Sequence, residues 1–217
     1  MTNVSAPQTL ADLLRELGEI PLERIRLYPP PGTATEQSVL EVEAQGRRLC
    51  ELVDGVLVEK AMGYVESIIA GAILAALRQF VVPKNLGHVS GPDGIMRLFP
   101  GLVRMPDVAF AAWDRFPDGR LPGEPIPDLV PDLVVEVVSA GNTPAEMDRK
   151  RHEYFEAGVR LVWIVDPSRR TVAVFCARDK YRELTEVDTL DGSDVLAGFS
   201  LSVADVFAEL DRQAGGA

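Results

Sequence analysis

The order of apolar and polar positions along the chain predicts an alternation of strands and helices. Two strand-like runs flank Asp54-Gly55, a residue pair typical of a tight β-hairpin. Apolar residues then recur at helical spacing over residues 63–81, which predicts a long helix. The other elements predicted in this half are a short helix at 9–17 and strands near 86–90, 95–99, 103–111 and 132–138.

The next helix has a well-marked start and end. Thr143 and Glu146 have the spacing of a capping box, Pro144 takes the first helical position, and Gly158 follows the last apolar residues. The elements expected after it are strands at 160–165, 171–176 and 181–187 and a final helix capped by Ser202. We therefore predict an α/β (α+β) fold, with a mixed central sheet flanked by helices and an added N-terminal hairpin.

A segment rich in Pro and Gly suggests where the main domain begins. The stretch YPPPGTAT, residues 28–35, does not suit regular structure and is typical of a linker. We predict an N-terminal helix and Pro-rich extension at 1–46, the main domain at 47–210 and a flexible tail at 211–217.

Glu136 stands in the middle of the strand-like run PDLVVEVVS, residues 131–139. Val134 and Val138 share its face of the strand, so neither face is polar enough to leave a carboxylate in water. Burial of an unpaired carboxylate is costly or forces protonation. Glu136 therefore needs a partner, which is either a salt bridge or a bound cation, unless it lies near the end of the strand.

Two further acids raise the same question. Asp107 follows Pro106 and begins the apolar run 108–112, although Pro-Asp is also ordinary turn chemistry. Glu66 falls within the apolar stripe of the helix at 63–81, although the helix dipole also favours a solvated Glu in the first turn. Both alternatives stay open for each residue.

Lys150 is the basic residue with an unexpected position. At about 100° per residue, it falls at the edge of the helix face that carries Met147 and Tyr154, whereas Arg149 points to the opposite side. The alternative is a lysine whose stem packs while its amine reaches water.

Composition limits the classes of function. The 217 residues are 47% hydrophobic and 25% charged, as in a soluble globular domain. The net charge of −11 argues against broad affinity for phosphate backbones, but it permits a local basic face or carboxylates that bind a divalent cation. No apolar run approaches the ~20 residues of a membrane span, and no signal-peptide pattern is seen, so we expect a cytoplasmic protein without a membrane partner.

The remaining motifs narrow the chemistry further. Cys50 and Cys176 are isolated, which argues against a disulfide framework and a thiolate zinc site. The sequence has no Walker loop, GxSxG or GxGxxG motif, and its two histidines do not suggest a catalytic triad. Several acids with one lysine suit metal-dependent phosphoryl chemistry, in which carboxylates hold Mg²⁺ and the lysine stabilises negative charge.

Several blocks in order resemble the Uma-two family of restriction-endonuclease-like proteins, within the PD-(D/E)xK nuclease superfamily. These blocks are CELVDGVLVEK before a long helix, then PDVAF, then PDLVVEVVSAGNTPAEMDRKRHEYFEAGVRLVWIVDP, and finally LAGFSLSVADVF. The resemblance covers roughly residues 47–210 and implies a restriction-endonuclease-like domain there.

The resemblance also implies roles for individual residues. Asp107 and Glu136 would be the acids of the motif and would ligate Mg²⁺, with the carbonyl of Val137 as a further ligand. Glu66 would match the acid that the superfamily often places on its first core helix. Val138 occupies the position of the usual motif lysine, so that role would pass to Lys150 on the following helix.

We therefore expect a Mg²⁺-dependent endonuclease that cleaves DNA, with Mn²⁺ as an alternative cofactor and a homodimer as the assembly. Arg149, Arg151 and Arg104 are the residues expected to contact nucleic acid. Two alternatives stay open: a nuclease-fold protein that binds or regulates without catalysis, and a metal-dependent phosphoesterase that acts on a small substrate. The pI of about 4.7 slightly favours the first of these.

Overall fold

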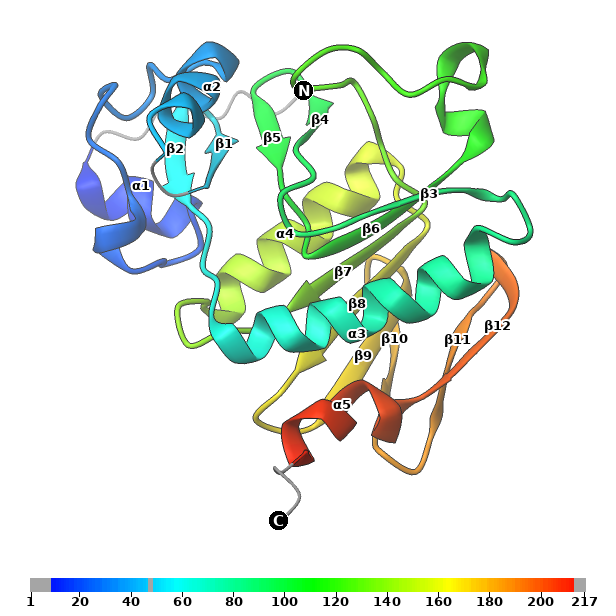
Figure 1. Cartoon of the computed structure of the whole chain (residues 1–217). Coiled ribbons are helices and arrows are strands. Elements are labelled where there is room, and N and C mark those ends of the chain that lie inside the picture. The colour runs from blue at the N-terminus through cyan, green and yellow to red at the C-terminus, as the bar shows by residue number, and fades with distance from the viewer. Residues whose placement is uncertain (1–8, 47–48, 213–217) are drawn as a thin grey trace, which may run out of the picture.

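A six-stranded mixed sheet forms the centre of the computed structural model, which describes residues 9–46 and 49–212 (Figure 1). Its strand order is β10-β9-β8-β7-β6-β3, and β7 and β8 are its parallel pair. The strands are β3 (Gly87–Ser90), β6 (Val108–Ala112), β7 (Leu133–Val137), β8 (Leu161–Asp166), β9 (Thr171–Ala177) and β10 (Lys180–Leu184).

Helices cover both faces of this sheet. On β7, Val135 packs in the same apolar cluster as Ile69 and Ile73 of α3 (Tyr64–Val81), and Figure 1 shows α3 in front of the sheet. The neighbouring Val134 packs instead with Tyr154 of α4 (Pro144–Ala157). Because alternate strand residues face opposite sides, α3 and α4 lie on opposite faces. Glu136 therefore shares the face covered by α4.

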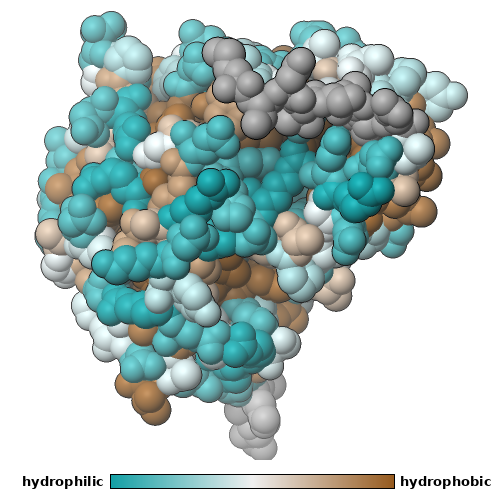
Figure 2. All heavy atoms as spheres, turned by 180° about the vertical axis from the view of Figure 1, so that it is seen from behind, coloured by the Kyte–Doolittle hydropathy of each residue, from teal (hydrophilic) through white to brown (hydrophobic). Residues whose placement is uncertain are grey.

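The apolar stripe of α3 is used in the core. By length and composition alone, α3 is the one helix among the described residues that could cross a membrane. Its residues Ile69, Ile73 and Leu77 are fully buried, and the helix also contacts α5 (Val203–Asp211). Seen from behind, most of the coloured surface is hydrophilic, with hydrophobic residues in smaller patches between (Figure 2).

Two smaller sheets complete the fold. The four-stranded sheet has the order β2-β1-β5-β4, and the two-stranded sheet pairs β11 with β12. Their strands are β1 (Cys50–Val53), β2 (Val56–Glu59), β4 (Met96–Phe99), β5 (Leu102–Arg104), β11 (Thr189–Gly192) and β12 (Leu196–Ser202). The hairpin predicted at Asp54-Gly55 is confirmed, and both turn residues have positive φ.

One predicted strand is wrong. The run 103–111 is not one strand, because β5 ends at Arg104 and β6 begins at Val108. The two strands belong to different sheets, so the chain leaves the small sheet and enters the central sheet between them. Pro106, which has no N–H for a sheet hydrogen bond, lies in this crossing.

The N-terminal segment packs on the domain. It contains α1 (Leu10–Glu16), a 3-10 turn (Leu22–Arg24) and α2 (Glu36–Ala44), and α2 was not predicted. Leu13 and Leu17 belong to the apolar cluster on the α4 face, and Val39 and Val42 pack with the small sheet. Residues 28–35 lack regular structure, as predicted. Of the predicted tail, residues 213–217 lie outside the described residues.

Candidate active site

Glu136 is buried where β7 faces α4. Its side chain is 6% exposed, and both carboxylate oxygens lie near the Nζ atom of Lys150, at 3.2 and 3.3 Å. The hydroxyl of Tyr154 donates a hydrogen bond to Oε1 of Glu136. Burial raises the pKa of Glu136, and the negative charges of Asp107 and Glu51 add to this, whereas Lys150 opposes it. The contacts with Lys150 and Tyr154 therefore favour the charged form of Glu136, whereas burial and the neighbouring acids disfavour it.

Asp107 lies next to Glu136 because of the strand register. Val108 of β6 pairs with Val135 of β7, so Asp107, just before β6, lies beside Glu136 on the neighbouring antiparallel strand. Oδ2 of Asp107 accepts a hydrogen bond of 2.7 Å from the backbone N–H of Val137. The structure thus gives Val137 a part in holding Asp107, while its carbonyl as a metal ligand stays a prediction.

Lys150 has the orientation expected from the phase of its helix. Its Nζ atom also lies 3.2 Å from Oε1 of Glu51, and the side chain is only 3% exposed. Burial alone lowers the pKa of Lys150, but the carboxylates of Glu136 and Glu51 outweigh that effect and raise the pKa above its ordinary value. The inward position is confirmed, and the alternative with the amine in water is excluded by this geometry.

Glu51 was missed by the sequence reasoning. It lies on β1, between β2 and β5, where it is fully buried. One oxygen accepts from the N–H of Met105 at 3.1 Å, and the other lies 2.6 Å from Nη1 of Arg104. Although burial raises the pKa of Glu51, Lys150 and Arg104 more than compensate and lower it to about 2. Glu51 stands between apolar residues in the strand-like run CELV. This pattern indicated a buried carboxylate in the same way as the pattern around Glu136.

Arg104 is placed differently from the expectation. We predicted a contact with nucleic acid, but Arg104 is 3% exposed and is paired with Glu51 and Glu153. The Arg104 side chain turns inward from β5 toward Glu51 on β1 and Glu153 on α4, and these acids neutralise its charge. Its guanidinium therefore belongs to the buried network that surrounds Lys150.

Arg149 and Arg151 lie on the outer side of α4. Arg149 pairs with Asp54 at 2.7 Å and with Glu153 at 2.7 Å. Arg151 pairs with Asp148 and stacks over the ring of Phe175 at 4.6 Å. A phosphate would have to replace carboxylate partners at both residues, and their contact with DNA stays a prediction.

Glu66 lies in the first turn of α3 and is half-buried. Its carboxylate folds over Gly63, where a Cβ atom would lie 2.2 Å from Oε2. It lines a cavity of about 300 Å³ together with Lys60 and Ser139. This is the first-turn position that was left open above. Among the described residues we see no contact between Glu66 and Asp107 or Glu136.

Lys60 is the second residue that the sequence reasoning missed. It follows β2 directly, and its Nζ atom lies 2.8 Å from Oδ1 of Asp107. The Lys60 side chain is 3% exposed. Each acid of the predicted metal pair therefore faces its own lysine, Asp107 with Lys60 and Glu136 with Lys150.

The start of α4 is fixed by contacts to the N-terminal segment. The predicted capping box is half present, since Thr143 accepts from the N–H of Glu146. The Glu146 side chain instead forms a two-point pair with Arg24 at 2.8 and 2.7 Å. Gly18, with φ of +80°, approaches so closely that a Cβ atom would lie 2.6 Å from the Glu146 nitrogen.

Whether these residues fit a divalent cation can be judged from their donors. No group of three or more His, Cys, Asp or Glu side chains in the described part of the chain is already arranged as a metal site. Asp107 and Glu136 nevertheless offer hard carboxylate oxygens side by side, as Mg²⁺ requires. The Lys60 ammonium shows that a positive charge is accommodated beside Asp107. The two carboxylates therefore fit a divalent cation that replaces this ammonium.

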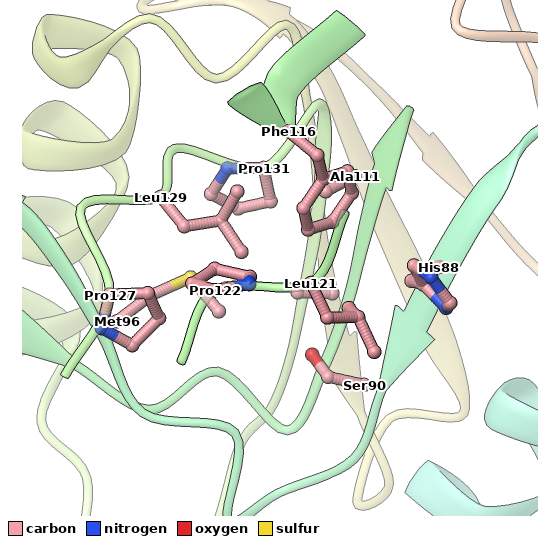
Figure 3. Close-up of a pocket in the computed structure, with 11 residues that line it drawn as sticks. His88, Ser90, Met96, Ala111, Phe116, Leu121, Pro122, Pro127, Leu129 and Pro131 are labelled. Carbon is pink, nitrogen blue, oxygen red and sulfur yellow. The ribbon is translucent and has the colours of Figure 1, made fainter. Parts of the chain in front are cut away.

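A second cavity has a different character. It measures about 230 Å³, and Figure 3 shows Met96, Phe116, Leu121 and Leu129 around it, with His88 and Ser90 on β3. Its lining contains no Asp, Glu, Lys or Arg. Without charged groups it offers little to a phosphate or a divalent cation, so the candidate active site is the cluster around Asp107 and Glu136.

Comparisons with known proteins identify the family of the chain and support its fold. The chain matches the model of the Uma2 family, described as "Putative restriction endonuclease", over residues 36–204. It is also similar to the crystal structure of "a putative nuclease belonging to DUF820" from Anabaena variabilis, with a TM-score of 0.66 and 18% identity. That alignment covers 79% of this chain and 98% of the other, and at this identity it concerns the fold. No curated protein matches the chain.

Proposed function

The chain belongs to the Uma2 family, and on this premise we propose that it is a Mg²⁺-dependent endonuclease that hydrolyses phosphodiester bonds of DNA. The observation that carries the proposal is the position of Lys150. The strand position of the usual motif lysine holds Val138, yet the Lys150 ammonium reaches Glu136 from α4, 3.2 Å from Oε1. An acid pair and a lysine are thereby assembled by the fold.

We assign a separate role to each residue of the cluster around Asp107 and Glu136. Asp107 and Glu136 would hold the cation, which when bound would supply positive charge to the phosphate and lower the pKa of a water molecule. Lys150 provides a fixed positive charge where negative charge develops on the phosphate. Glu51 and Tyr154 are positioning residues, because the first contacts Lys150 and the second contacts Glu136.

The experiment that tests the proposal is nicking of supercoiled plasmid in Mg²⁺, Mn²⁺ or EDTA. We expect nicking in the presence of either metal, and loss of at least about 10² in rate for Asp107→Asn and Glu136→Gln. Glu124→Gln changes an exposed carboxylate and serves as the control. Nicking that survives EDTA, or that is equal in all four proteins, would contradict the proposal.

Binding to DNA is expected to depend strongly on salt. Arg149, Arg151 and Arg97 are partly exposed, and phosphate contacts made by such residues release counterions from DNA. Fluorescence anisotropy with a labelled duplex should therefore show weaker affinity as NaCl rises. The same measurement with Arg149→Ala should give a smaller salt slope. An affinity that does not respond to salt would argue against contacts with the DNA backbone.

One observation favours a second candidate function. Because Lys60 and Lys150 already neutralise Asp107 and Glu136, the cluster balances charge without a metal. A nuclease-fold protein that binds or regulates without catalysis would show the same arrangement. Calorimetric titration with Mn²⁺ distinguishes the two, since the second candidate requires no binding of the cation.

A further inference from the structure

Lys60 reaches Asp107 from an irregular part of the chain. The residue lies in the segment 60–63, which has no regular structure and joins β2 to α3. Lys150 and Arg104, by contrast, are carried by a helix and a strand. Besides its 2.8 Å contact with Asp107, the Lys60 ammonium donates a 2.9 Å hydrogen bond to the carbonyl of Pro92. Lys60 is thus the cluster's cation with the least rigid support.

Lys60 also stands between the carboxylates and the cavity. It lines the cavity of about 300 Å³, together with Arg24, Glu59, Glu66 and Ser139. Asp107 and Glu136 do not line that cavity, and as whole residues each is 4% exposed. A cation or a phosphate that enters from the cavity therefore meets Lys60 before it meets Asp107.

A divalent cation bound to Oδ1 of Asp107 would compete with the Lys60 ammonium, which lies closer to its carboxylate than Lys150 does to Glu136. Mg²⁺ binds oxygen at about 2.0–2.1 Å, and the ammonium already lies 2.8 Å from Oδ1. Two positive charges at this separation repel each other strongly in a buried site. A long side chain with four rotatable bonds can avoid this repulsion by turning into the cavity.

We propose that Lys60 is a movable lysine of the active site, which neutralises Asp107 until a divalent cation displaces it and then binds the substrate phosphate in the cavity. The inference rests on the proposed function. A phosphate in the cavity needs added positive charge, because Glu23, Glu59 and Glu66 on its wall would repel it. Arg24 on the same wall is already paired with Glu146, so the displaced Lys60 ammonium is the cation that would supply this charge.

Titration calorimetry with MnCl₂ alone tests the displacement. We expect Lys60→Met to bind Mn²⁺ about tenfold more tightly or better than the unchanged protein, because no side chain competes for Asp107. Lys84→Met removes one exposed lysine and should leave the affinity unchanged. Equal or weaker affinity in Lys60→Met would overturn the displacement. Absence of Mn²⁺ binding in every protein would overturn it together with the proposed function.

A second variant addresses folding. Lys60→Met leaves Asp107 buried without a cation, which is destabilising, whereas Lys60→Gln keeps a donor for the carbonyl of Pro92. Mn²⁺ should raise the Tm of Lys60→Gln by more than it raises the Tm of the unchanged protein, because the metal replaces the missing charge. Equal rises in Tm would show a merely structural ion pair and overturn the proposal.

Anisotropy with a labelled DNA duplex in saturating Mn²⁺ tests the phosphate contact. Lys60→Gln should bind the duplex about tenfold more weakly, which is the loss expected when one charge-assisted contact is removed. An unchanged affinity for DNA would overturn the contact between Lys60 and the phosphate. The displacement of Lys60 by the cation would then still be decided by the calorimetric titration. If the unchanged protein binds Mn²⁺ but not DNA, the phosphate contact and the DNA substrate both fail, and the calorimetric result for Lys60 still stands.

Discussion

Replacement of Lys150 by Ala should lower plasmid nicking by about 10²–10³, with Mn²⁺ binding nearly intact. Loss of one electrostatic group at a reacting centre typically has this effect on rate. Lys150 is suited to the role because it is buried at 3% exposure and lies within 3.3 Å of both oxygens of Glu136. Rates at saturating plasmid, measured beside a Mn²⁺ titration, separate transition-state stabilisation from binding.

The neighbouring residue gives a matched control. Arg149 lies one position earlier on the same helix but pairs with Asp54 on the outer side. Arg149→Ala should affect affinity for DNA without a comparable loss of rate at saturating substrate. Because Lys150→Ala also removes the cation that contacts two buried acids, its folded fraction must be checked by near-UV circular dichroism. Equal nicking by Lys150→Ala and the unchanged protein would remove Lys150 from the site.

Replacement of Glu51 by Gln should destabilise the fold by about 3–5 kcal/mol, the usual effect of breaking a buried ion pair. Glu51 is fully buried and contacts Arg104, Lys150 and the backbone of Met105. The neutral amide would leave two buried cations short of negative charge. Urea denaturation measures the loss, and Glu124→Gln provides an exposed control.

The same variant has an expected pH dependence. The pKa of Glu51 falls from 4.5 to about 2 on folding, so the folded state favours the charged form. The resulting stabilisation is present above pH 4.5 and is lost as the pH falls toward 2. It amounts to about 3 kcal/mol, since one pKa unit corresponds to about 1.4 kcal/mol. The stability difference between the two proteins should therefore shrink over this interval, and a constant difference would contradict the assignment.

Local patterns were sufficient to identify the residues whose own element fixes their direction. Glu136 was conspicuous because a strand with apolar residues on both faces offers it no water, and Lys150 followed from the phase of a helix between Thr143 and Gly158. The hairpin at Asp54-Gly55 was equally local. In each case the direction of the side chain depended only on the geometry of one strand, helix or turn.

The partners of Glu51, Lys60 and Arg104 could not be identified in this way, because they are distant in sequence. Arg104 and Glu51 are 53 positions apart, and their pairing requires β5 to lie beside β1. Lys60 meets Asp107 only after the small sheet has packed beside the central one. Within 103–111, Arg104, Pro106 and Asp107 interrupt the apolar residues, but such a local break does not reveal that the strands on either side belong to different sheets.

The contacts at the start of α4 have a consequence for where the nuclease unit begins. The Uma2 match starts at residue 36, yet Gly18 and Arg24 hold the first turn of the helix that carries Lys150. The shared family region therefore does not contain all the parts that aim its lysine. In this chain the segment before residue 36 fixes the start of α4 from outside the family region. An alignment restricted to that region would leave out Gly18 and Arg24, which position the helix that carries Lys150.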